Sequence, residues 1–360
     1  MVQKKILELC LSPDLGGLEL FMVGCYENFK TKTTCQIMVA PQKKLDNYIE
    51  SQEKFYLKRN KFLPIVPALK LAKFIDKYEI DMVHFHWTRD IATVVLAKLL
   101  STRKPKLIQT RNMTMTRFKD DIYHKWLYKN IDILHAVTYQ VKEQLERFIP
   151  QEVRPKVEVV YMGTDDPRKE KTRIEELRKI YKLGDSFIVG IIGRIEEGKG
   201  QYLVLEAVAK LRELDIKALI VGHTMDEAYL NTIKQKVKDL DIENKVIFQG
   251  FTKELNEHIH LCNTMVLGTE QETFGLVVID AMINKVTVIA TNKGGPLEII
   301  EHEKDGLLFE RNSEDLAKNI ELLYCNPELN KKLSLAGYLK AKKIFNRETQ
   351  FKKLLGLIGA

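Results

Sequence analysis

With 360 residues, 45% of them apolar and 29% charged, the chain has the composition of a soluble globular protein and a length that favours two domains. No apolar run approaches the roughly 20 residues of a membrane-spanning helix, and the five cysteines are odd in number without a C-x-x-C pair. These features argue against an integral membrane protein, a disulfide-stapled secreted protein and a zinc-binding module. They favour a cytoplasmic protein with reduced thiols and no metal.

The positive charge lies in the first part of the chain. Residues 1–165 contain 27 lysines and arginines against 19 acidic residues, while residues 166–360 contain 30 of each, so the whole net charge of +8 belongs to the first part. Such an excess indicates an anionic partner, either a phosphate-bearing lipid, an anionic membrane surface or a nucleic acid. A lysine-rich but functionally neutral surface explains it equally well.

Strand-length apolar runs alternate with helix-length amphipathic segments, which is typical of parallel α/β sheets. In the first part we expect strands at residues 4–11, 35–40, 81–87, 106–110, 133–138 and 157–162, and helices after residue 17, at 68–77, from 90 and at 121–129. A polar stretch, residues 163–171, follows as a linker. Between these elements, residues 54–63 interleave aromatic and cationic side chains, which fits either a segment at a membrane surface or a solvated helix with its aromatics toward the core.

A second α/β series begins after the linker. We expect strands at residues 187–193, 217–222, 246–249, 264–267 and 286–290, and helices at 201–214 and 274–283, with a charged helix between residues 222 and 246. Two Rossmann-like domains facing a central cleft follow from this order. Neither domain has G-x-G-x-x-G directly after a strand, and Gly198-Lys199-Gly200 lacks the spacing of a P-loop, so a dinucleotide oxidoreductase and a P-loop protein are disfavoured.

A glycine-bearing loop follows the first strand of the second series. It reads Gly193-Arg194-Ile195-Glu196-Glu197-Gly198-Lys199-Gly200, and it places two cations at the carboxyl end of a parallel strand, where α/β sheets bind ligands. Arg194 and Lys199 are near enough in sequence to reach one diphosphate. An ordinary surface loop with solvated charges is the alternative.

A second candidate segment combines two carboxylates with the start of a helix. Glu272 flanks the expected helix start at Phe274, and Asp280 lies inside an otherwise apolar helical stretch. Free N–H groups of Phe274, Gly275 and Leu276 would form an anion site. A buried Asp280 requires a partner, such as a sugar hydroxyl or a satisfying group in the core.

These segments resemble glycosyltransferase family 4, whose members are retaining enzymes with the GT-B fold. The resemblance rests on motifs in the family's order along nearly the whole chain: Gly16-Gly17 with Glu19, Asp81-Met-Val-His84-Phe-His86, Gly193-Arg194 with Lys199-Gly200, Glu272-Thr273-Phe274-Gly275 with Asp280, Thr291-Asn-Lys-Gly294-Gly295-Pro296-Leu-Glu298, and Asp305-Gly306-Leu307-Leu308.

The resemblance implies a role for each matching residue. Arg194 and Lys199 would neutralise the departing diphosphate, and Glu272 would bind the transferred sugar. Asp280 would bind the nucleotide ribose, and the loop at Gly16 and Gly17 would close on the phosphates. Further donor contacts are implied for Gly193, Thr273, Phe274, Gly275, Leu276 and Gly295, and acceptor contacts for His86, Arg111 and Asn112.

The chain departs from the family pattern at two positions. Asp280 stands where the family has a second glutamate, and Asn112 stands where a strand of the family ends in Thr-Arg-His. An amide can bind a sugar hydroxyl but does not titrate, so we expect activity to survive. His84 and His86 alternate on a strand and share one face, which points either to the cleft or to a satisfied core site.

The resemblance also implies the domain organisation and the reaction. We expect an acceptor domain at 1–165, a nucleotide-sugar domain at 166–340, and a C-terminal helix at 341–360 that packs back on the first domain. The chain would transfer a hexose or N-acetylhexosamine from a UDP- or GDP-sugar, without cofactor or metal, to a glycan or lipid-linked acceptor in surface polysaccharide or glycolipid synthesis. It would act in the cytoplasm, in peripheral contact with an anionic membrane.

The alternatives are a sugar-nucleotide epimerase, a non-catalytic glycan-binding subunit and a nucleic-acid-binding protein. The last of these has no accompanying motif.

Overall fold

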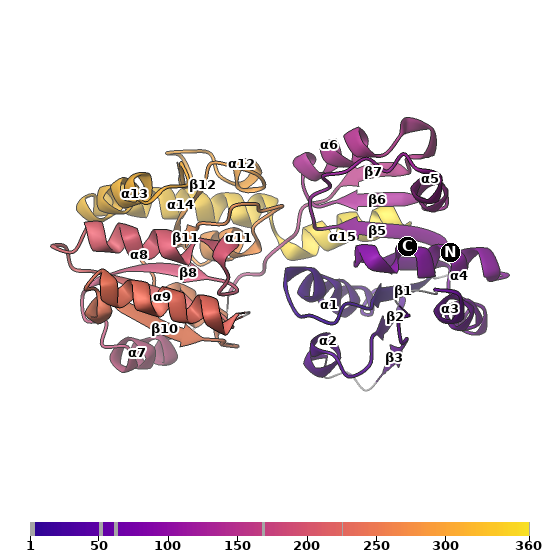
Figure 1. Ribbon diagram of the computed structural model, residues 1–360, viewed down its shortest axis with the longest axis horizontal. Coiled ribbons are helices and arrows are strands. Elements are labelled where there is room, and N and C mark those ends of the chain that lie inside the picture. Colours follow the sequence, from indigo (N-terminus) through magenta and orange to yellow (C-terminus); the bar gives the residue numbers. More distant parts are fainter. Residues whose placement is uncertain (1–3, 50–52, 61–63, 168–169, 225, 360) are drawn as a thin grey trace. The chain divides into compact units, whose positions relative to one another are not determined.

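The computed structural model describes residues 4–49, 53–60, 64–167, 170–224 and 226–359. The chain forms two compact units, Met1–Met162 together with Arg347–Ala360, and Gly163–Asn346. Each unit is an α/β fold built on one parallel sheet, as the sequence pattern predicts (Figure 1).

The first unit contains a seven-stranded parallel sheet with the order β3-β2-β1-β4-β5-β6-β7. Its strands are β1 (Lys5–Cys10), β2 (Thr34–Val39), β3 (Lys54–Tyr56), β4 (Met82–Phe85), β5 (Lys106–Arg111), β6 (Ile133–Ala136) and β7 (Lys156–Val159). Its helices are α1 (Gly17–Phe29), α2 (Lys44–Tyr48), α3 (Ile65–Tyr78), α4 (Ile91–Leu100), α5 (Ile122–Lys129), α6 (Tyr139–Phe148) and α15 (Arg347–Ile358).

The central strand β1 explains why the first sheet is buried on both faces. It pairs in parallel with β2 on one side and β4 on the other, and all its residues after Lys5 are buried. Helices cover both faces of such a sheet, so its strands read as continuous apolar runs rather than alternating ones. The acidic Glu8 in the middle of β1 is therefore an exception that needs hydrogen-bond partners.

The C-terminal helix α15 belongs to the first unit, as the resemblance implied. Its Phe351 is 4% exposed, and its ring centroid lies 6.0 Å from those of both Phe21 and Phe29 on α1. Gly24 makes this approach possible, because a Cβ at that position would lie 3.1 Å from Cζ of Phe351. Helix α15 thus returns to α1 through aromatic packing.

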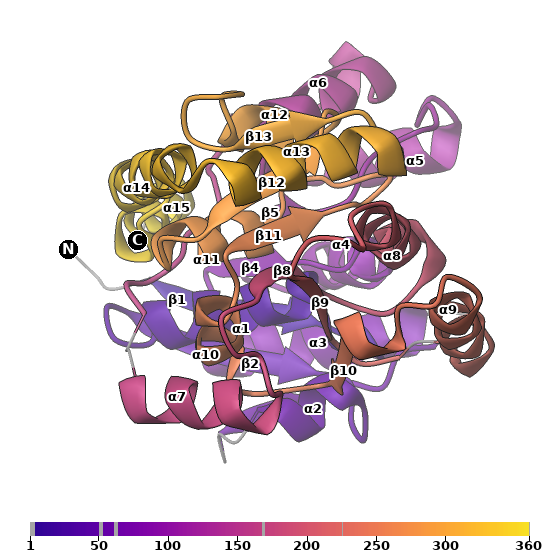
Figure 2. The same cartoon turned by 90° about the vertical axis from the view of Figure 1, so that its left-hand side faces the viewer.

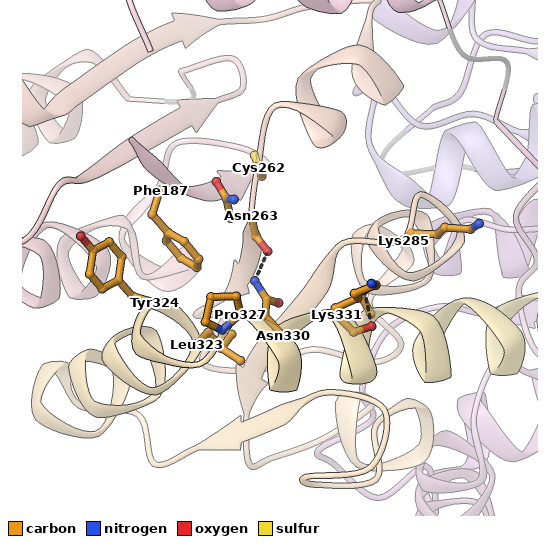
Figure 3. Close-up of a pocket in the computed structure, with 10 residues that line it drawn as sticks. Phe187, Cys262, Asn263, Lys285, Leu323, Tyr324, Pro327, Asn330 and Lys331 are labelled. Atoms are coloured by element: carbon orange, nitrogen blue, oxygen red, sulfur yellow. Dashed lines mark hydrogen bonds between the residues drawn. The ribbon is translucent and has the colours of Figure 1, made fainter. Parts of the chain in front are cut away.

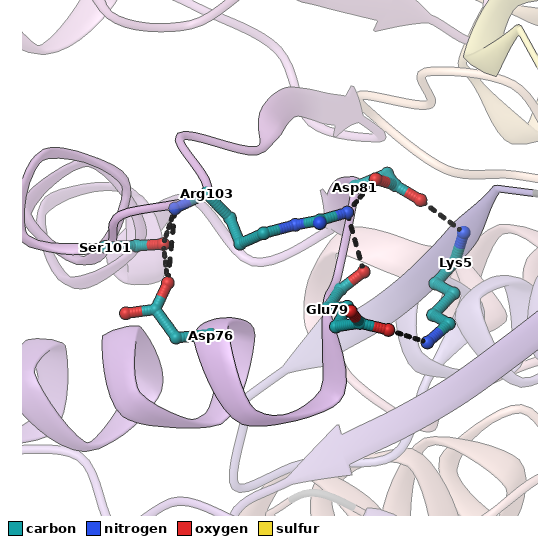
Figure 4. Close-up of polar contacts among 6 residues, drawn as sticks. All are labelled: Lys5, Asp76, Glu79, Asp81, Ser101 and Arg103. Carbon is teal, nitrogen blue, oxygen red and sulfur yellow. Dashed lines mark hydrogen bonds and ion pairs between the residues drawn. The ribbon is translucent and has the colours of Figure 1, made fainter.

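A polar network ties the amino edge of the first sheet together (Figure 4). The carboxylate of Asp76, at the end of α3, accepts hydrogen bonds from the Ser101 hydroxyl at 2.6 Å and from the Thr102 N–H at 3.0 Å. Asp81 accepts from the Lys5 N–H at 2.9 Å and from the Arg103 guanidinium. The Ser101 hydroxyl and the neighbouring N–H groups lower the pKa of Asp76. These contacts fix the ends of α3 and α4 against β1 and β4.

The second unit contains a six-stranded parallel sheet with the order β10-β9-β8-β11-β12-β13. Its strands are β8 (Phe187–Ile192), β9 (Ile216–Val221), β10 (Val246–Gly250), β11 (Thr264–Leu267), β12 (Thr287–Thr291) and β13 (Leu307–Phe309). Its helices are α7 (Lys171–Ile180), α8 (Gln201–Lys210), α9 (Glu227–Asp239), α10 (Leu255–His260), α11 (Leu276–Ile283), α12 (Pro296–Ile299), α13 (Ser313–Cys325) and α14 (Pro327–Ile344).

Helices form a layer on each face of the second sheet. In Figure 2, α8, α9 and α13 lie on one face, while α7, α10, α11 and α14 lie on the other. The side chains of α8 and α13 fill the first interface together with those of β8 and β9, and Val204, Leu205 and Ile320 are fully buried there. In the described parts of both units, no helix is both long enough and apolar enough to cross a membrane.

The structure corrects several expected boundaries. Residues 54–56 form strand β3, which pairs with β2. The helix considered for residues 54–63 is therefore wrong for residues 54–60, and residues 61–63 lie outside the described residues. The strand expected at 157–162 is β7, which ends at Val159. The predicted linker at 163–171 is described except at residues 168–169, and its Lys171 already begins α7.

Candidate functional site

The loops that carry Arg194, Lys199 and Glu272 meet at one edge of the second sheet. Strand β8 lies between β9 and β11, so the strand order reverses at β8. Open α/β sheets bind ligands beyond the carboxyl ends of the strands at such a reversal. The loop after β8 carries Arg194 and Lys199, and the loop after the neighbouring β11 carries Glu272.

The loop after β8 is shaped by close backbone packing. Gly193 has φ 154° and Gly222 has φ 152°, and a Cβ at Gly222 would lie 1.7 Å from the carbonyl oxygen of Gly193. The side-chain amide of Gln201 donates to the carbonyl oxygen of Arg194 at 2.8 Å. The Arg194 side chain is exposed, and its guanidinium lies 2.9 Å from the Glu196 carboxylate.

Two contacts join this loop to the one after β11. Gly200 has φ 80°, and a Cβ there would lie 2.5 Å from the carbonyl oxygen of Gly268. The N–H of Glu270 donates to the carbonyl oxygen of Gly198 at 2.9 Å. The ammonium of Lys199 then lies 3.4 Å from Oε2 of Glu272, with both side chains largely but not fully buried. The structure thus brings Lys199 and Glu272 together across the reversal point.

The segment after Glu272 is held by a third loop. The N–H of Gly295 donates to the carbonyl oxygen of Glu272 at 2.8 Å. A Cβ at Gly295 would lie 2.6 Å from the backbone N and Cα of Phe274, so only glycine fits without movement of the backbone. Phe274 is 2% exposed and packs edge-on against Phe345.

Helix α11 begins later than the sequence suggested. The expected start at Phe274 is wrong, because Gly275 has φ 101° and the helix runs from Leu276. A left-handed residue directly before the helix turns the chain sharply, and glycine adopts this conformation without steric cost. Thr273, Phe274 and Gly275 therefore form a turn that leads into α11.

Asp280 is half-buried rather than fully buried, in contrast to the expectation from its apolar neighbours. Its Oδ1 accepts a hydrogen bond from the Thr164 hydroxyl at 2.6 Å. Sequence reasoning missed Thr164 because it lies 116 residues away. No local motif signals that pairing.

A cavity of about 400 Å³ lies at the opposite edge of the second sheet (Figure 3). Phe187, at the start of β8, and Asn263, before β11, line it together with Lys331 of α14. Ligands bind at the carboxyl edge of parallel sheets rather than the amino edge, so this cavity stands apart from Arg194 and Glu272.

The remaining predicted residues lie in the first unit, near the ends of its strands and at the start of α1. Gly16 precedes α1 and Gly17 begins it, and the nearby Glu19 is 6% exposed. Arg111 ends β5 and is 5% exposed; burial lowers the pKa of its guanidinium. Asn112 follows it and is half-buried. Arg111 donates to the Thr88 hydroxyl and to the carbonyl oxygen of Met113.

His84 and His86 belong to a buried polar network, so both occupy a core site, although Nδ1 of His86 has no hydrogen-bond partner among the described residues. His84 Nδ1 lies 2.9 Å from Oε1 of Glu8, and His86 Nε2 lies 2.7 Å from Oε2. His84 Nε2 lies 2.6 Å from the Thr110 hydroxyl, which also contacts His135 Nδ1 at 2.8 Å. Cys25 Sγ lies within 4.8 Å of the Glu8, His84 and His86 ligand atoms. Direct hydrogen bonds already occupy both oxygens of Glu8.

A count of donors and acceptors shows which neighbour receives the proton of the Thr110 hydroxyl. His135 Nε2 donates to the carbonyl oxygen of Val160 at 2.7 Å, and burial lowers the pKa of His135 to about 3, so its Nδ1 is an acceptor. Thr110 must then give its single proton to His135, and His84 must donate to both Glu8 and Thr110. With Glu8 as a carboxylate, this pattern requires both ring nitrogens of His84 to donate.

Burial and charge act in opposite directions on Glu8. Burial raises the pKa of Glu8, but the His84 charge and the hydrogen bonds of His84 and His86 lower it overall. Burial also lowers the pKa of His86 to about 4, with the His84 charge as a second cause. Burial thus keeps His86 and His135 neutral near neutral pH.

Comparison with known proteins matches both units to glycosyltransferases. The family model described as Glycosyltransferase Family 4 matches residues 37–168, and the model described as Glycosyl transferases group 1 matches residues 173–340. The chain is 30% identical over 251 residues to N-acetyl-alpha-D-glucosaminyl L-malate synthase of Bacillus anthracis, covering 68% of this chain and 65% of that protein. It is 29% identical to alpha-1,3/1,6-mannosyltransferase ALG2 of Homo sapiens, over 61% of this chain and 54% of that protein. The matches thus span about two thirds or less of these relatives' lengths.

Solved structures share the fold across nearly the whole chain. A glycosyltransferase from Rickettsia africae superposes with a TM-score of 0.89 at 22% identity, covering 99% of this chain and 98% of that one. Anabaena Alr3699/HepE, crystallised with UDP and glucose, superposes with a TM-score of 0.86 at 18% identity and 99% coverage of both chains. The two matched models in sequence order, the relatives and the shared two-sheet fold show that the chain belongs to the family 4 glycosyltransferases of the GT-B fold.

Proposed function

We propose that this protein is a retaining glycosyltransferase that needs no metal ion and moves a hexose or N-acetylhexosamine from a UDP- or GDP-sugar to a glycan or lipid-linked acceptor. The observation that carries the proposal is the pairing of Lys199 with Glu272 at the reversal of the second sheet, where Lys199 shares its loop with Arg194. A cation and a carboxylate at one ligand edge suit a donor that combines a diphosphate with sugar hydroxyls.

The chemistry follows from the leaving group. Because a nucleoside diphosphate departs, catalysis consists mainly of stabilising its developing charge and positioning the sugar. In the proposal, Arg194 and Lys199 bind the diphosphate, and Glu272 accepts hydrogen bonds from the sugar hydroxyls. The donor's own phosphate oxygen takes the proton of the acceptor hydroxyl on the face that the diphosphate leaves, so the anomeric configuration is retained.

The Lys199–Glu272 contact also suggests how the empty site is kept stable. Each group compensates the other's charge while both are largely withdrawn from water. When a donor enters, the ammonium turns to the phosphates and the carboxylate to the sugar, so neither loses a partner. Asp280 contacts the ribose in the same proposal, with Thr164 holding its carboxylate in place.

Relatives support a nucleotide-sugar donor, although the nucleotide base of the donor differs between them. HepE was crystallised with UDP-glucose, and a phosphatidylinositol monomannoside mannosyltransferase of Mycobacterium tuberculosis, 33% identical over 43% of this chain, is GDP-mannose-dependent. The basic excess of residues 1–165 supports peripheral contact with an anionic membrane at the cytoplasmic face.

The test is a panel of UDP- and GDP-sugars scored by thermal shift in the presence of EDTA. A ligand that binds only the native protein raises the melting temperature by mass action, and we expect one donor to do so despite the chelator. The matching donor should then transfer its sugar only when an acceptor is added. Stabilisation abolished by EDTA would contradict the metal-free proposal, and conversion of the donor without an acceptor would indicate an epimerase.

A further inference from the structure

A cavity of about 260 Å³ lies in the first unit, at the carboxyl edge of β4 and β5. Its walls come from the turn after β4, which carries Thr88 and Arg89, and from Tyr123 and His124 of α5. Pockets for whole drug-sized ligands hold roughly 300–1,000 Å³. The cavity therefore suits one small group of a larger ligand.

The charges around the cavity are of one sign. Arg59, Arg89 and Lys119 line it, and its described lining contains no Asp or Glu. Within the part of the chain that the structure describes, none of these three cations forms an ion pair with a carboxylate. Three uncompensated cations around one concave space raise the local concentration of anions.

The nearby acidic groups do not cancel this charge. Asp90 is fully buried, its carboxylate accepts the Leu11 N–H at 2.9 Å, and burial raises its pKa to about 7 although the Leu11 N–H and the Arg59 charge lower it. Asp121 pairs with His124, which leaves that imidazole compensated. Neither acidic group forms an ion pair with Arg59, Arg89 or Lys119.

A buried arginine beside the cavity gives a second, independent observation. Arg111 is 5% exposed and donates to the hydroxyl of Thr88, which lines the cavity. Its Nε has no hydrogen-bond partner, and no described carboxylate pairs with it. A buried, uncompensated guanidinium is costly, and an anion in the cavity would reduce that cost.

We propose that this cavity binds a phosphate or diphosphate group carried by the acceptor. The proposal rests on the transferase function only in naming the ligand an acceptor; binding of the anion stands on the cavity itself. Guanidinium groups suit phosphate because their planar N–H donors match its oxygens. The lining hydroxyls of Thr88 and Tyr123 add neutral donors.

Helix α5 favours a lipid as the carrier of that phosphate. Ile122 is 89% exposed and Tyr123 is 54% exposed, and Tyr123 also lines the cavity. Trp126, one turn further, is 36% exposed. Aromatic and aliphatic side chains beside cations are typical of segments that rest in a membrane interface. The helix would place the cavity at the height of lipid headgroups.

Trp87 offers a reporter for the cavity alone. The guanidinium of Arg59 lies 4.9 Å from the centre of its ring and that of Arg89 lies 5.5 Å away. The chain has two tryptophans, Trp87 and Trp126, so a Trp126→Phe protein has Trp87 as its single fluorophore. Since the second unit contains no tryptophan, diphosphate bound near Arg194 gives no direct signal.

The experiment titrates pyrophosphate into the full-length Trp126→Phe protein and follows Trp87 emission. We expect a saturable change, weakened about tenfold by Lys119→Gln, because one charge-assisted hydrogen bond is lost while both guanidinium contacts of Trp87 remain. Lys129→Gln on the exposed side of α5 is the matched control and should leave the affinity unchanged. Arg194→Ala should also leave it unchanged, which separates this proposal from failure of the donor site.

Two further arms distinguish the carriers. Methyl diphosphate in solution is compared with an alkyl diphosphate embedded in neutral phosphatidylcholine vesicles, and tighter binding of the second, reduced by Lys119→Gln, identifies a lipid carrier. Equal affinity identifies a soluble phosphorylated acceptor. The proposal is overturned if none of the three ligands changes Trp87 emission saturably, or if Lys119→Gln and Lys129→Gln bind them equally well.

Discussion

Single glycines fix the positions of the loops around Arg194 and Glu272. At Gly200, Gly222 and Gly295 a Cβ would approach backbone atoms within 2.6 Å, closer than real Cβ atoms come. Side chains can rotate away from a clash, but backbone cannot, so each of these glycines is required by contact rather than by flexibility. The charged residues of the site therefore project from a backbone with little freedom to shift.

Replacing Gly295 by alanine should show this constraint. Its Cβ would meet the backbone N and Cα of Phe274, and overpacking of this kind costs about 1–3 kcal/mol of unfolding free energy. The matched control is Gly198→Ala, where nothing lies within 4 Å. Urea unfolding of both variants measures the difference; equal stability of the two would contradict the assigned contact.

The proposed roles of Arg194 and Glu272 predict different kinetic effects. Arg194→Ala should lower kcat by about 10² to 10³-fold, the scale for loss of one preorganised stabiliser of transition-state charge. Glu272→Gln should lower kcat while leaving the affinity for the free nucleoside diphosphate nearly unchanged. Asp280→Asn should weaken nucleotide binding itself, because the ribose contact is present before and after transfer.

Steady-state kinetics and nucleotide titrations separate these cases, and NMR of the product determines its anomeric configuration. Every active variant should retain the configuration of the donor. An inverted product, or undiminished turnover of Glu272→Gln, would contradict the assigned roles.

Among the elements of the first unit, four neighbouring strands are joined by the buried network of Glu8. Glu8 lies on β1, His84 on β4, Thr110 on β5 and His135 on β6. These strands are neighbours in the sheet, so the network runs across the sheet as backbone pairing does. A buried ion pair contributes little net stability, but removal of one partner is strongly destabilising.

Glu8→Gln should therefore lower the free energy of unfolding by about 1–3 kcal/mol, since an amide has one acceptor oxygen where the carboxylate has two, and one of the two buried histidine contacts is lost. Glu27→Gln, which changes an exposed carboxylate paired with Lys30, is the control and should change it by less than about 1 kcal/mol. NMR of the wild-type imidazole should show both nitrogens of His84 protonated. A neutral His84 would contradict the hydrogen-bond assignment.

The same network predicts acid sensitivity. His86 and His135 are neutral in the folded state, with pKa values lowered by burial from 6.5 to about 4 and about 3. Below pH 6.5 the unfolded chain binds protons that the folded protein does not, so stability falls as the pH falls. Each histidine contributes a loss of about 1.4 kcal/mol per pH unit until its folded pKa is reached.

The lowered pKa of Glu8 acts in the same direction at still lower pH. Chemical unfolding between pH 7 and pH 5 measures the slope. A His135→Gln variant should show a shallower one, and a free energy of unfolding that is constant over this range would contradict the neutral state of the two histidines.

For the whole molecule, the asymmetry of charge is the dominant electrostatic feature. Residues 1–165 hold the entire excess of positive charge, and the cavity with Arg59, Arg89 and Lys119 lies in the same unit. Charge on one unit attracts an anionic surface to that unit.

Binding to vesicles should accordingly depend on lipid charge and on salt. We expect the protein to sediment with anionic vesicles more than with neutral ones, and the difference to disappear as salt shortens the Debye length from about 10 Å at 0.1 M to about 3 Å at 1 M. Equal sedimentation with both kinds of vesicle would indicate that the positive charge only keeps the protein surface solvated and does not attract a membrane.

Most strands of both units were predictable because parallel sheets buried on both faces read as apolar runs, whereas strand β3 and helices α6 and α13 were not expected. The start of α11 was not, because Gly275 adopts a left-handed conformation that the neighbouring residues of the sequence do not signal. The motifs around Arg194 and Glu272 predicted residues that the fold brings to one sheet edge. The partners of Asp280 and His84 come from distant strands and loops, and spacing along the chain carries no signal for them.

The contact of Gly200 with the Gly268 carbonyl oxygen bears on how such a protein can diversify. Because the backbones of these two loops are in direct contact, a mutation that moves one loop must be matched by a mutation that moves the other. Selection for a new donor sugar would then act on side chains of the fixed loops, such as Thr273. Libraries aimed at altered specificity should randomise those positions and spare the glycines.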